Sequence, residues 1–133
     1  MKDLKNLINV VPGVPVQAFS SAKTVEGSLV DLNEFNSACL LVLAGNAWTD
    51  GSYTLTVKEG DAADGSDLAD VDPSLLVKDA AAGVVGAANA VSRVGYVGTK
   101  RFIKPSLTST GVTTGATAGV LVIEGNPKNG PVA

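Results

Sequence analysis

The sequence contains no histidine. Imidazole is the usual general base near neutral pH and a frequent metal ligand, so its absence excludes Ser-His-Asp triads, Cys-His pairs and the common zinc sites. The single cysteine, Cys39, excludes an internal disulfide. Because Cys39 lies in an apolar run, we expect it to pack as a small hydrophobic side chain. These absences predict a protein that is not an enzyme and that carries no cofactor or metal.

Charged residues are also scarce, at 17% of the chain against about 25% in ordinary soluble domains. The net charge of −3 is spread without a basic stripe, so we expect no nucleic-acid partner. Hydrophobic residues reach 45%, yet no run approaches the ~18 apolar residues of a membrane helix, so we expect no membrane partner. Two explanations of the low charge stay open: a well-packed β domain, or a surface largely covered by partners.

If apolar surface is exposed, self-association is the simplest way to cover it. We therefore expect a homodimer, with a trimer as the alternative, and an interface built from a sandwich face or from exchanged termini. The first residues lack the apolar stretch of a signal peptide, so we expect synthesis in the cytoplasm.

Short segments with β character follow one another from residue 14 onward, in a chain long enough for one domain. We expect strands over residues 14–19, 24–32, 36–44, 53–59, 90–97, 101–108 and 118–124. Seven or eight short strands with few helices predict an all-β sandwich or barrel. We divide the chain into an N-terminal arm (residues 1–13), a β domain (residues 14–125) and an extended C-terminal tail (residues 126–133).

Two local patterns make sharper predictions. The near-continuous apolar run from Asn36 to Ala44 predicts a strand covered on both faces. The turn pair Asp50-Gly51, followed by alternating residues over 53–59, predicts a β-hairpin. Pro15 indicates an edge strand, because proline cannot donate a ladder hydrogen bond.

Apolar residues in the arm recur at helical spacing, but the Pro-Gly pair at 12–13 ends any helix before it gains length. The arm is therefore either a short cap on the sandwich or a segment that lies on a neighbouring molecule. Its candidate partner-binding residues are Leu4, Leu7, Ile8 and Val11.

Lys100, Arg101 and Lys104 form the one local cluster of positive charge. They are candidates for contact with an acidic partner surface. Strand alternation places Lys104 on the opposite face from Arg101, so they do not form a one-faced patch, and a solvated strand end is the alternative.

Five carboxylates fall within twelve residues, at Asp61, Asp64, Asp67, Asp70 and Asp72. Calcium takes 6–8 oxygen ligands, but the ligand spacing of an EF-hand cannot be laid onto these residues. We expect a solvent-facing, mobile, metal-free loop, with weak calcium binding as the alternative.

Two other classes of function stay open. Trp48 and Tyr53 flank a turn, and if exposed they would favour a receptor- or carbohydrate-binding module of a fibre or head spike. A deep cleft with two close carboxylates would instead favour a small hydrolase that uses Asp and Glu.

Several short motifs, taken in order, are similar to small virion structural proteins of tailed bacteriophages. The stretch from Val91 to Lys104 resembles a recurring Arg-Val-Gly-Tyr-Ile-Gly strand followed by a Lys-Arg-aromatic strand. The matching segments elsewhere are Val30-Asp31-Leu32, the Asp-Gly-x-Tyr turn at 50–53, an Asp-Gly acidic loop, and the closing strand 119–127. The resemblance covers most of residues 24–127, and the acidic loop departs from it by being longer and rich in alanine up to Gly86.

This resemblance implies a capsid decoration or cement protein. The fold is then an all-β, jelly-roll-like β-sandwich of about seven or eight short strands with extended termini. The protein would bind the outside of the assembled head in the virion, clamp neighbouring capsid subunits, and have the major capsid protein as its partner. The resemblance supplies no catalytic residues.

Overall fold

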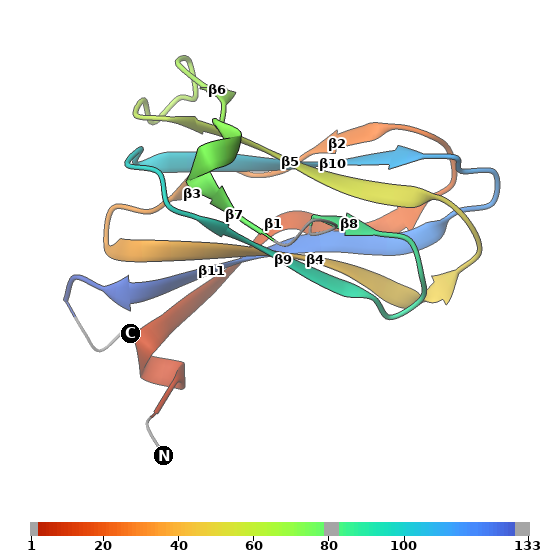
Figure 1. Cartoon of the computed structure of the whole chain (residues 1–133), viewed down its shortest axis with the longest axis horizontal. Helices are drawn as coiled ribbons and strands as arrows, with labels where there is room; N and C mark the ends of the chain where they lie inside the picture. Colours follow the sequence, from red (N-terminus) through yellow and green to blue (C-terminus); the bar gives the residue numbers. More distant parts are fainter. Residues whose placement is uncertain (1–2, 79–82, 130–133) are drawn as a thin grey trace.

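Alternating apolar side chains give the long strands one buried face each, and these faces pack against one another in two antiparallel sheets (Figure 1). The computed structural model describes residues 3–78 and 83–129. Sheet A has the strand order β1-β11-β4-β9-β7, and sheet B has the order β2-β10-β5-β6, with β3 paired to β10 and β8 paired to β5.

The bounds of the elements follow the sheets. In sheet A the strands are β1 (Ile8–Phe19), β11 (Ala116–Pro127), β4 (Phe35–Trp48), β9 (Val91–Tyr96) and β7 (Leu76–Val77). In sheet B they are β2 (Thr24–Glu26), β10 (Phe102–Thr110), β5 (Ser52–Gly60), β6 (Ala69–Asp70), β3 (Val30–Asp31) and β8 (Val84–Val85). Two 3-10 turns complete the described structure, η1 (Lys5–Leu7) and η2 (Pro73–Leu75).

Successive long strands alternate between the sheets. The chain passes from β1 in sheet A to β2 in sheet B, from β4 to β5, and from β9 to β10 before it returns to sheet A in β11. This wrapping is the connectivity of a jelly roll. The prediction of an all-β sandwich is confirmed.

The core lies between the sheets. Sheet A contributes side chains such as Leu40 and Val122, sheet B contributes Ile103 and Leu107, and all four are fully buried. At one end of the core the rings of Phe19 and Tyr53 meet edge to face, with centroids 5.3 Å apart.

The hairpin predicted at Asp50-Gly51 is wrong. This turn connects β4 in sheet A to β5 in sheet B, and the two strands do not pair with each other. The turn is held instead by its aspartate, whose carboxylate accepts hydrogen bonds from the backbone N–H groups of Thr113, Thr114 and Gly115 in the loop before β11. An Asp-Gly pair gives a tight turn, but the long-range packing of the strands decides whether they pair.

The N-terminal arm is shorter than the predicted residues 1–13. β1 begins at Ile8 and pairs with β11 from the register pair Ile8 with Gly125, so only η1 and the residues before it stand off the sandwich (Figure 1). A strand forms here because an edge of sheet A offers backbone partners, whereas a one-turn helix in water is unstable. Pro15 lies in this edge strand, as predicted.

The predicted tail is also partly strand. β11 continues to Pro127, and the N–H of Lys128 donates to the carbonyl of Glu34 at 2.9 Å. Residues 130–133 of the predicted tail lie outside the described residues.

The prediction that the apolar run 36–44 is covered on both faces is wrong. Ala38, Leu40 and Val42 are buried against sheet B, whereas Cys39 and Leu41, with Leu43, are only half-buried on the outer face of sheet A. Within one chain no further layer of described residues covers that face. Cys39 is accordingly a half-buried rather than a buried residue.

We expect the carboxylate of Asp50 to make stability depend on pH. The hydroxyl of Thr113, together with three backbone N–H groups, lowers the pKa of Asp50 to about 2. A carboxyl whose pKa is lower in the folded state stabilises the fold above its unfolded pKa, and this contribution is lost as the pH falls from about 4 towards 2. Asp50→Asn should therefore lower the thermal midpoint at pH 7 and flatten its decline between pH 4 and pH 2.

Thermal unfolding followed by circular dichroism across this pH range measures both effects. The matched control is Asp70→Asn, which changes an exposed carboxylate on β6. Equal pH profiles for wild type and Asp50→Asn would show that this turn does not depend on the aspartate.

Candidate functional site

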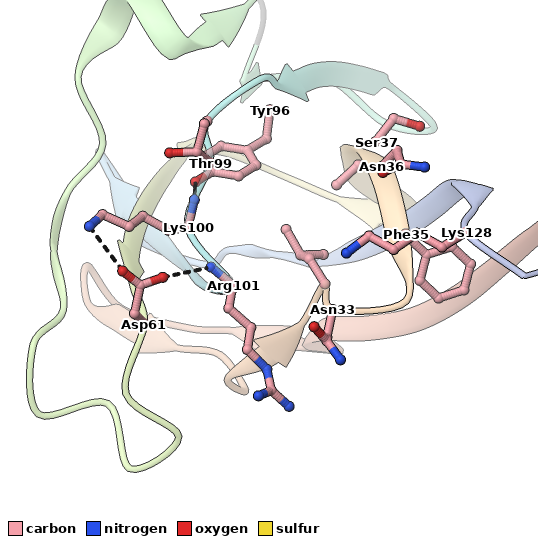
Figure 2. A pocket seen from close by; sticks show the side chains of 13 residues that line it. Asn33, Phe35, Asn36, Ser37, Asp61, Tyr96, Thr99, Lys100, Arg101 and Lys128 are labelled. Carbon is pink, nitrogen blue, oxygen red and sulfur yellow. Dashed lines mark hydrogen bonds and ion pairs between the residues drawn. The ribbon is translucent and has the colours of Figure 1, made fainter.

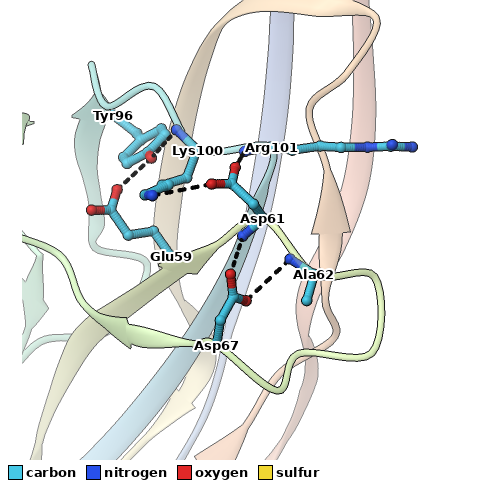
Figure 3. A network of polar contacts seen from close by, with 7 residues as sticks. All are labelled: Glu59, Asp61, Ala62, Asp67, Tyr96, Lys100 and Arg101. Atoms are coloured by element: carbon cyan, nitrogen blue, oxygen red, sulfur yellow. Dashed lines mark hydrogen bonds and ion pairs between the residues drawn. The ribbon is translucent and has the colours of Figure 1, made fainter.

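A polar network surrounds the turn at residues 97–101, which carries the chain from β9 to β10 (Figure 3). Tyr96 ends β9, and its hydroxyl donates to a carboxylate oxygen of Glu59 on β5 at 2.5 Å. The N–H of Lys100 donates back to the same hydroxyl at 3.3 Å. Burial and the hydrogen bond to Glu59 raise the pKa of Tyr96 well above its ordinary value. The phenol thus joins the two sheets through polar contacts at this end of the core.

A glycine allows the tyrosine ring to take this position. A Cβ at Gly98 would lie 2.3 Å from the hydroxyl oxygen of Tyr96 and 2.4 Å from its Cζ. Any larger residue would push the ring out of the network.

Asp61 ties the beginning of the acidic loop to the same turn (Figure 3). Its carboxylate accepts from Nζ of Lys100 at 3.0 Å and from the backbone N–H of Arg101 at 3.1 Å. These contacts, the lysine first, lower the pKa of Asp61, and the same pair raises the pKa of Lys100. The pair is exposed, so it contributes at most about 1 kcal/mol to stability.

Arg101 forms a second, two-pronged pair with Asp31. Its Nε and Nη2 donate to the two carboxylate oxygens of Asp31 at 3.0 Å and 2.9 Å. The hydrogen bonds from Arg101 lower the pKa of Asp31. The guanidinium is therefore already neutralised within the chain.

Beside this turn lies a polar cavity of about 300 Å³ (Figure 2). Its walls come from the turn at 97–101, from the start of β4 and from the end of β11, and they include the side chains of Asn33, Phe35, Asn36 and Lys128. Asp61 is the one acid among the described residues that line it. Amide and ammonium groups of this kind can hold a polar or anionic group of a partner.

The structure does not gather the predicted partner-binding residues into one site. Lys100 and Arg101 line the cavity, whereas Lys104 lies on β10 and pairs with Glu26 at 3.4 Å. Each of the three cations thus has an acidic partner in its own chain.

The apolar candidates lie at the N-terminus. Leu4 and Leu7 are 63% and 43% exposed on the segment that stands off the sandwich, and Ile8 is half-buried in β1. Val11 is partly buried and packs against the core, so it belongs to the sandwich rather than to an arm.

The aromatic surface considered for a carbohydrate-binding module is not formed. Tyr53 is fully buried, and its hydroxyl donates to the carbonyl of Asp50 at 2.9 Å. Trp48 packs partly buried against the core, with its Nε1 buried. Both rings serve the packing of the sandwich.

The acidic loop is ordered by hydrogen bonds rather than mobile. The carboxylate of Asp67 accepts from the N–H groups of Asp61 and Ala62, and the carboxylates of Asp64 and Asp72 accept from Ser66 and Ser74 (Figure 3). These hydrogen bonds lower the pKa of each of the three aspartates. Within residues 3–78 and 83–129, no three Asp, Glu or Cys side chains gather as metal ligands would.

Sequence reasoning missed three features of this end of the molecule: Tyr96, Glu59 and Lys128. Each comes from a different strand or strand end, and no spacing along the chain predicts that they meet. By contrast, the alternation of residues 39, 41 and 43 in an apolar run did carry a signal for the half-buried outer face of sheet A.

Comparison with known proteins gives one structural likeness. The crystal structure of the SPBc2 prophage-derived protein YomS matches with a TM-score of 0.49 and 13% sequence identity, over 89% of this chain and 96% of that one. No protein-family model and no curated protein matches the sequence. A likeness at this level carries no argument about function. Among the described residues, no helix has the length and apolar character needed to cross a membrane.

We expect the acidic loop to bind no calcium at millimolar concentration, because its carboxylate oxygens already accept backbone hydrogen bonds or pair with Lys100. Isothermal titration with CaCl₂ should give no saturable heat, and Asp67→Asn should leave the titration unchanged. A thermal midpoint that rises by several degrees in millimolar Ca²⁺, and no longer does so in Asp67→Asn, would contradict this expectation.

Proposed function

We propose that this chain is a structural protein of a bacteriophage virion, a capsid decoration protein that binds the outside of the assembled head and clamps neighbouring copies of the major capsid protein. The proposal combines two lines of support: the motifs over residues 91–104 that are similar to small phage virion proteins, and the surface of the folded chain.

The observation that carries the binding role is the exposure of large apolar side chains away from the core. Leu4 and Leu7 are exposed on a segment that projects beyond sheet A, where Lys5 is the only charged residue of η1 (Figure 1). Contiguous exposed apolar surface normally marks a place where another molecule binds. A short apolar segment joined to a stiff sandwich suits a clamp, because the sandwich fixes one end while the segment reaches a neighbouring subunit.

The motif region supports the same role in a different way. Residues 91–104 form β9, the turn at 97–101 and the start of β10, which together join the two sheets at the polar cavity. Because Lys100 and Arg101 are paired within the chain, we assign this region mainly to holding the sandwich rigid. Lys128 and the amides of the cavity are then the polar groups offered to a capsid subunit.

Such a clamp stabilises the head by mass action. A protein that binds the assembled lattice and not its dissociated subunits lowers the free energy of the lattice by an amount that grows with its concentration. Catalysis is not required, and we therefore infer that the chain acts by binding alone.

The test is co-sedimentation with purified heads of the phage or prophage whose genome encodes the chain. The wild-type protein should pellet with the heads and saturate at many copies per particle. Removal of residues 1–7 should weaken this binding roughly tenfold or more, because the burial of two leucines is lost. The thermal midpoint should stay near that of wild type, since β1 and its pairing with β11 remain.

A double variant, Leu4→Ser with Leu7→Ser, repeats the test without shortening the chain, and Lys5→Ser on the same turn is its matched control. Absence of the wild-type protein from the pelleted heads at saturating concentration would rule out the decoration role. Normal binding of both the truncated protein and the double variant would show that the N-terminal segment is not the clamp.

A further inference from the structure

The two outer faces of the sandwich differ sharply in chemistry. On sheet B the outward side chains form polar rows across the strands, such as Thr24, Thr108 and Thr54, where the first two hydroxyls lie 3.0 Å apart. The neighbouring row brings Ser106 beside Thr56. This is the pattern of a sheet face that meets water.

Sheet A presents apolar rows at the corresponding positions. One row runs across all five strands, through Val10, Ile123, Cys39, Gly95 and Val77. Register pairs in antiparallel strands point to the same side of a sheet, so these residues share the outer face.

The next row contains Pro12, Leu121, Leu41 and Arg93. We call the two rows together the apolar face. Its margins are strongly exposed in the single chain, with Val10 at 49% and Val77 at 61%. The same sequence that places threonine and serine on one outer face thus leaves aliphatic side chains open on the other.

The apolar face is large enough for a stable interface. Five strands at a spacing of about 4.8 Å give a width of about 24 Å, and the eight residue steps from Ser37 to Gly45 give a length of about 26 Å. The flat area is therefore roughly 500–600 Å² per copy, allowing for the shorter β7 and β9. Two such faces would bury about 1,000–1,200 Å² in total, which reaches the size expected of a specific interface.

The shape of the first row is self-complementary. At Gly95 the face is hollowed, and a cavity of about 320 Å³ is lined by Cys39, Val77 and Gly95, with Arg93 and Lys78 at its margin. On the other side of Cys39 in the same row stands the side chain of Ile123. A twofold axis parallel to the strands over β4 would bring Ile123 of each copy to the hollow at Gly95 of the other, and would bring the two Cys39 residues together.

Charge also favours a second copy over a charged partner. Arg93 is the one charged residue in the two rows, and at its level β9 is the edge strand, because β7 pairs only with residues 95 and 96. Its long side chain can cover apolar surface while its guanidinium reaches water at the rim. The centre of the face carries no charge, as in the cores of protein interfaces.

From these observations we propose that the apolar face of sheet A is the interface of a twofold homodimer, in which the sheets of two copies stack face to face with Ile123 in the hollow at Gly95. The two stacked sheets adopt the aligned packing of β-sandwiches, with strands within about 30° of each other. The inference deepens the proposed decoration role, since it rests on the premise that the chain works by assembly, and a dimer gives each unit two N-terminal segments with which to reach capsid subunits.

Sedimentation velocity over a range of micromolar concentrations tests the dimer on the full chain. The wild-type protein should sediment as a species of 26.8 kDa, twice the chain mass of 13.4 kDa. Leu41→Arg places an unpaired charge in the middle of the apolar face and should raise the dissociation constant by roughly a hundredfold or more. Thr56→Arg on the exposed face of sheet B is the matched control and should leave the dissociation constant within about threefold.

The single cysteine supplies a second readout that needs no folding-sensitive substitution. In the wild-type dimer a short bis-maleimide should join Cys39 of one copy to Cys39 of the other, at a pH near 8.5 because burial raises the pKa of this thiol. Crosslinking should disappear in Leu41→Arg and persist in Thr56→Arg. Gly95→Ile, which fills the hollow, should also weaken the dimer; a Cβ there meets Val77 at an ordinary 3.4 Å, so the strand can accept it.

The outcomes separate this inference from the proposed function. A wild-type monomer at all concentrations, or a dimer that Leu41→Arg weakens no more than Thr56→Arg does, would overturn the interface, even if the protein still binds phage heads. A dimer that crosslinks through Cys39 but never pellets with heads would support the interface and count against the decoration role. A monomer whose binding to heads is abolished by Leu41→Arg would assign the apolar face to the capsid and overturn the dimer.

Discussion

Sheets A and B are held together by the side chains of their inner faces, and because successive long strands alternate between the sheets, every turn between them must cross the edge of that core. Burying Leu40, Val122, Ile103 or Leu107 in this layer contributes roughly 1.5–3 kcal/mol each. The turns themselves then need local hydrogen bonds, because they leave one sheet and enter the other without a paired strand to support them.

The chain meets this need with carboxylates and a phenol placed at the crossings. Asp50 holds the loop before β11 through three backbone N–H groups, and Tyr96 with Glu59 holds the turn from β9 to β10. Asp61 draws the acidic loop against that second turn through Lys100. Much of the small complement of charge in this protein is therefore used within the chain, which leaves little of it for recognition.

The distribution of the remaining surface follows from the same economy. Sheet B faces outward with threonine, serine and lysine, so it is complete as a water-facing layer. Sheet A faces outward with valine, leucine, isoleucine and cysteine, as an inner sheet of a sandwich does. A face of this composition is finished only when another layer covers it, and the projecting Leu4 and Leu7 extend the same apolar character beyond the sheet. Binding by burial of flat apolar surface, rather than by charge or by a catalytic centre, is the role to which this construction is suited.

The amino-acid pattern by itself determined the class of the protein: β-strands in the right places, an edge strand at Pro15, an apolar N-terminal segment, and no histidine-based chemistry. These are properties of periodicity and composition, which act over a few residues. Which strands pair was decided only by tertiary structure, because the Asp50-Gly51 turn suits a hairpin and a crossover equally well, and the burial of the inner faces selects the crossover. For the same reason the ends of the arm, the cluster of Tyr96, Glu59 and Lys128, and the open apolar face appear only in the folded chain, where residues up to about a hundred positions apart become neighbours.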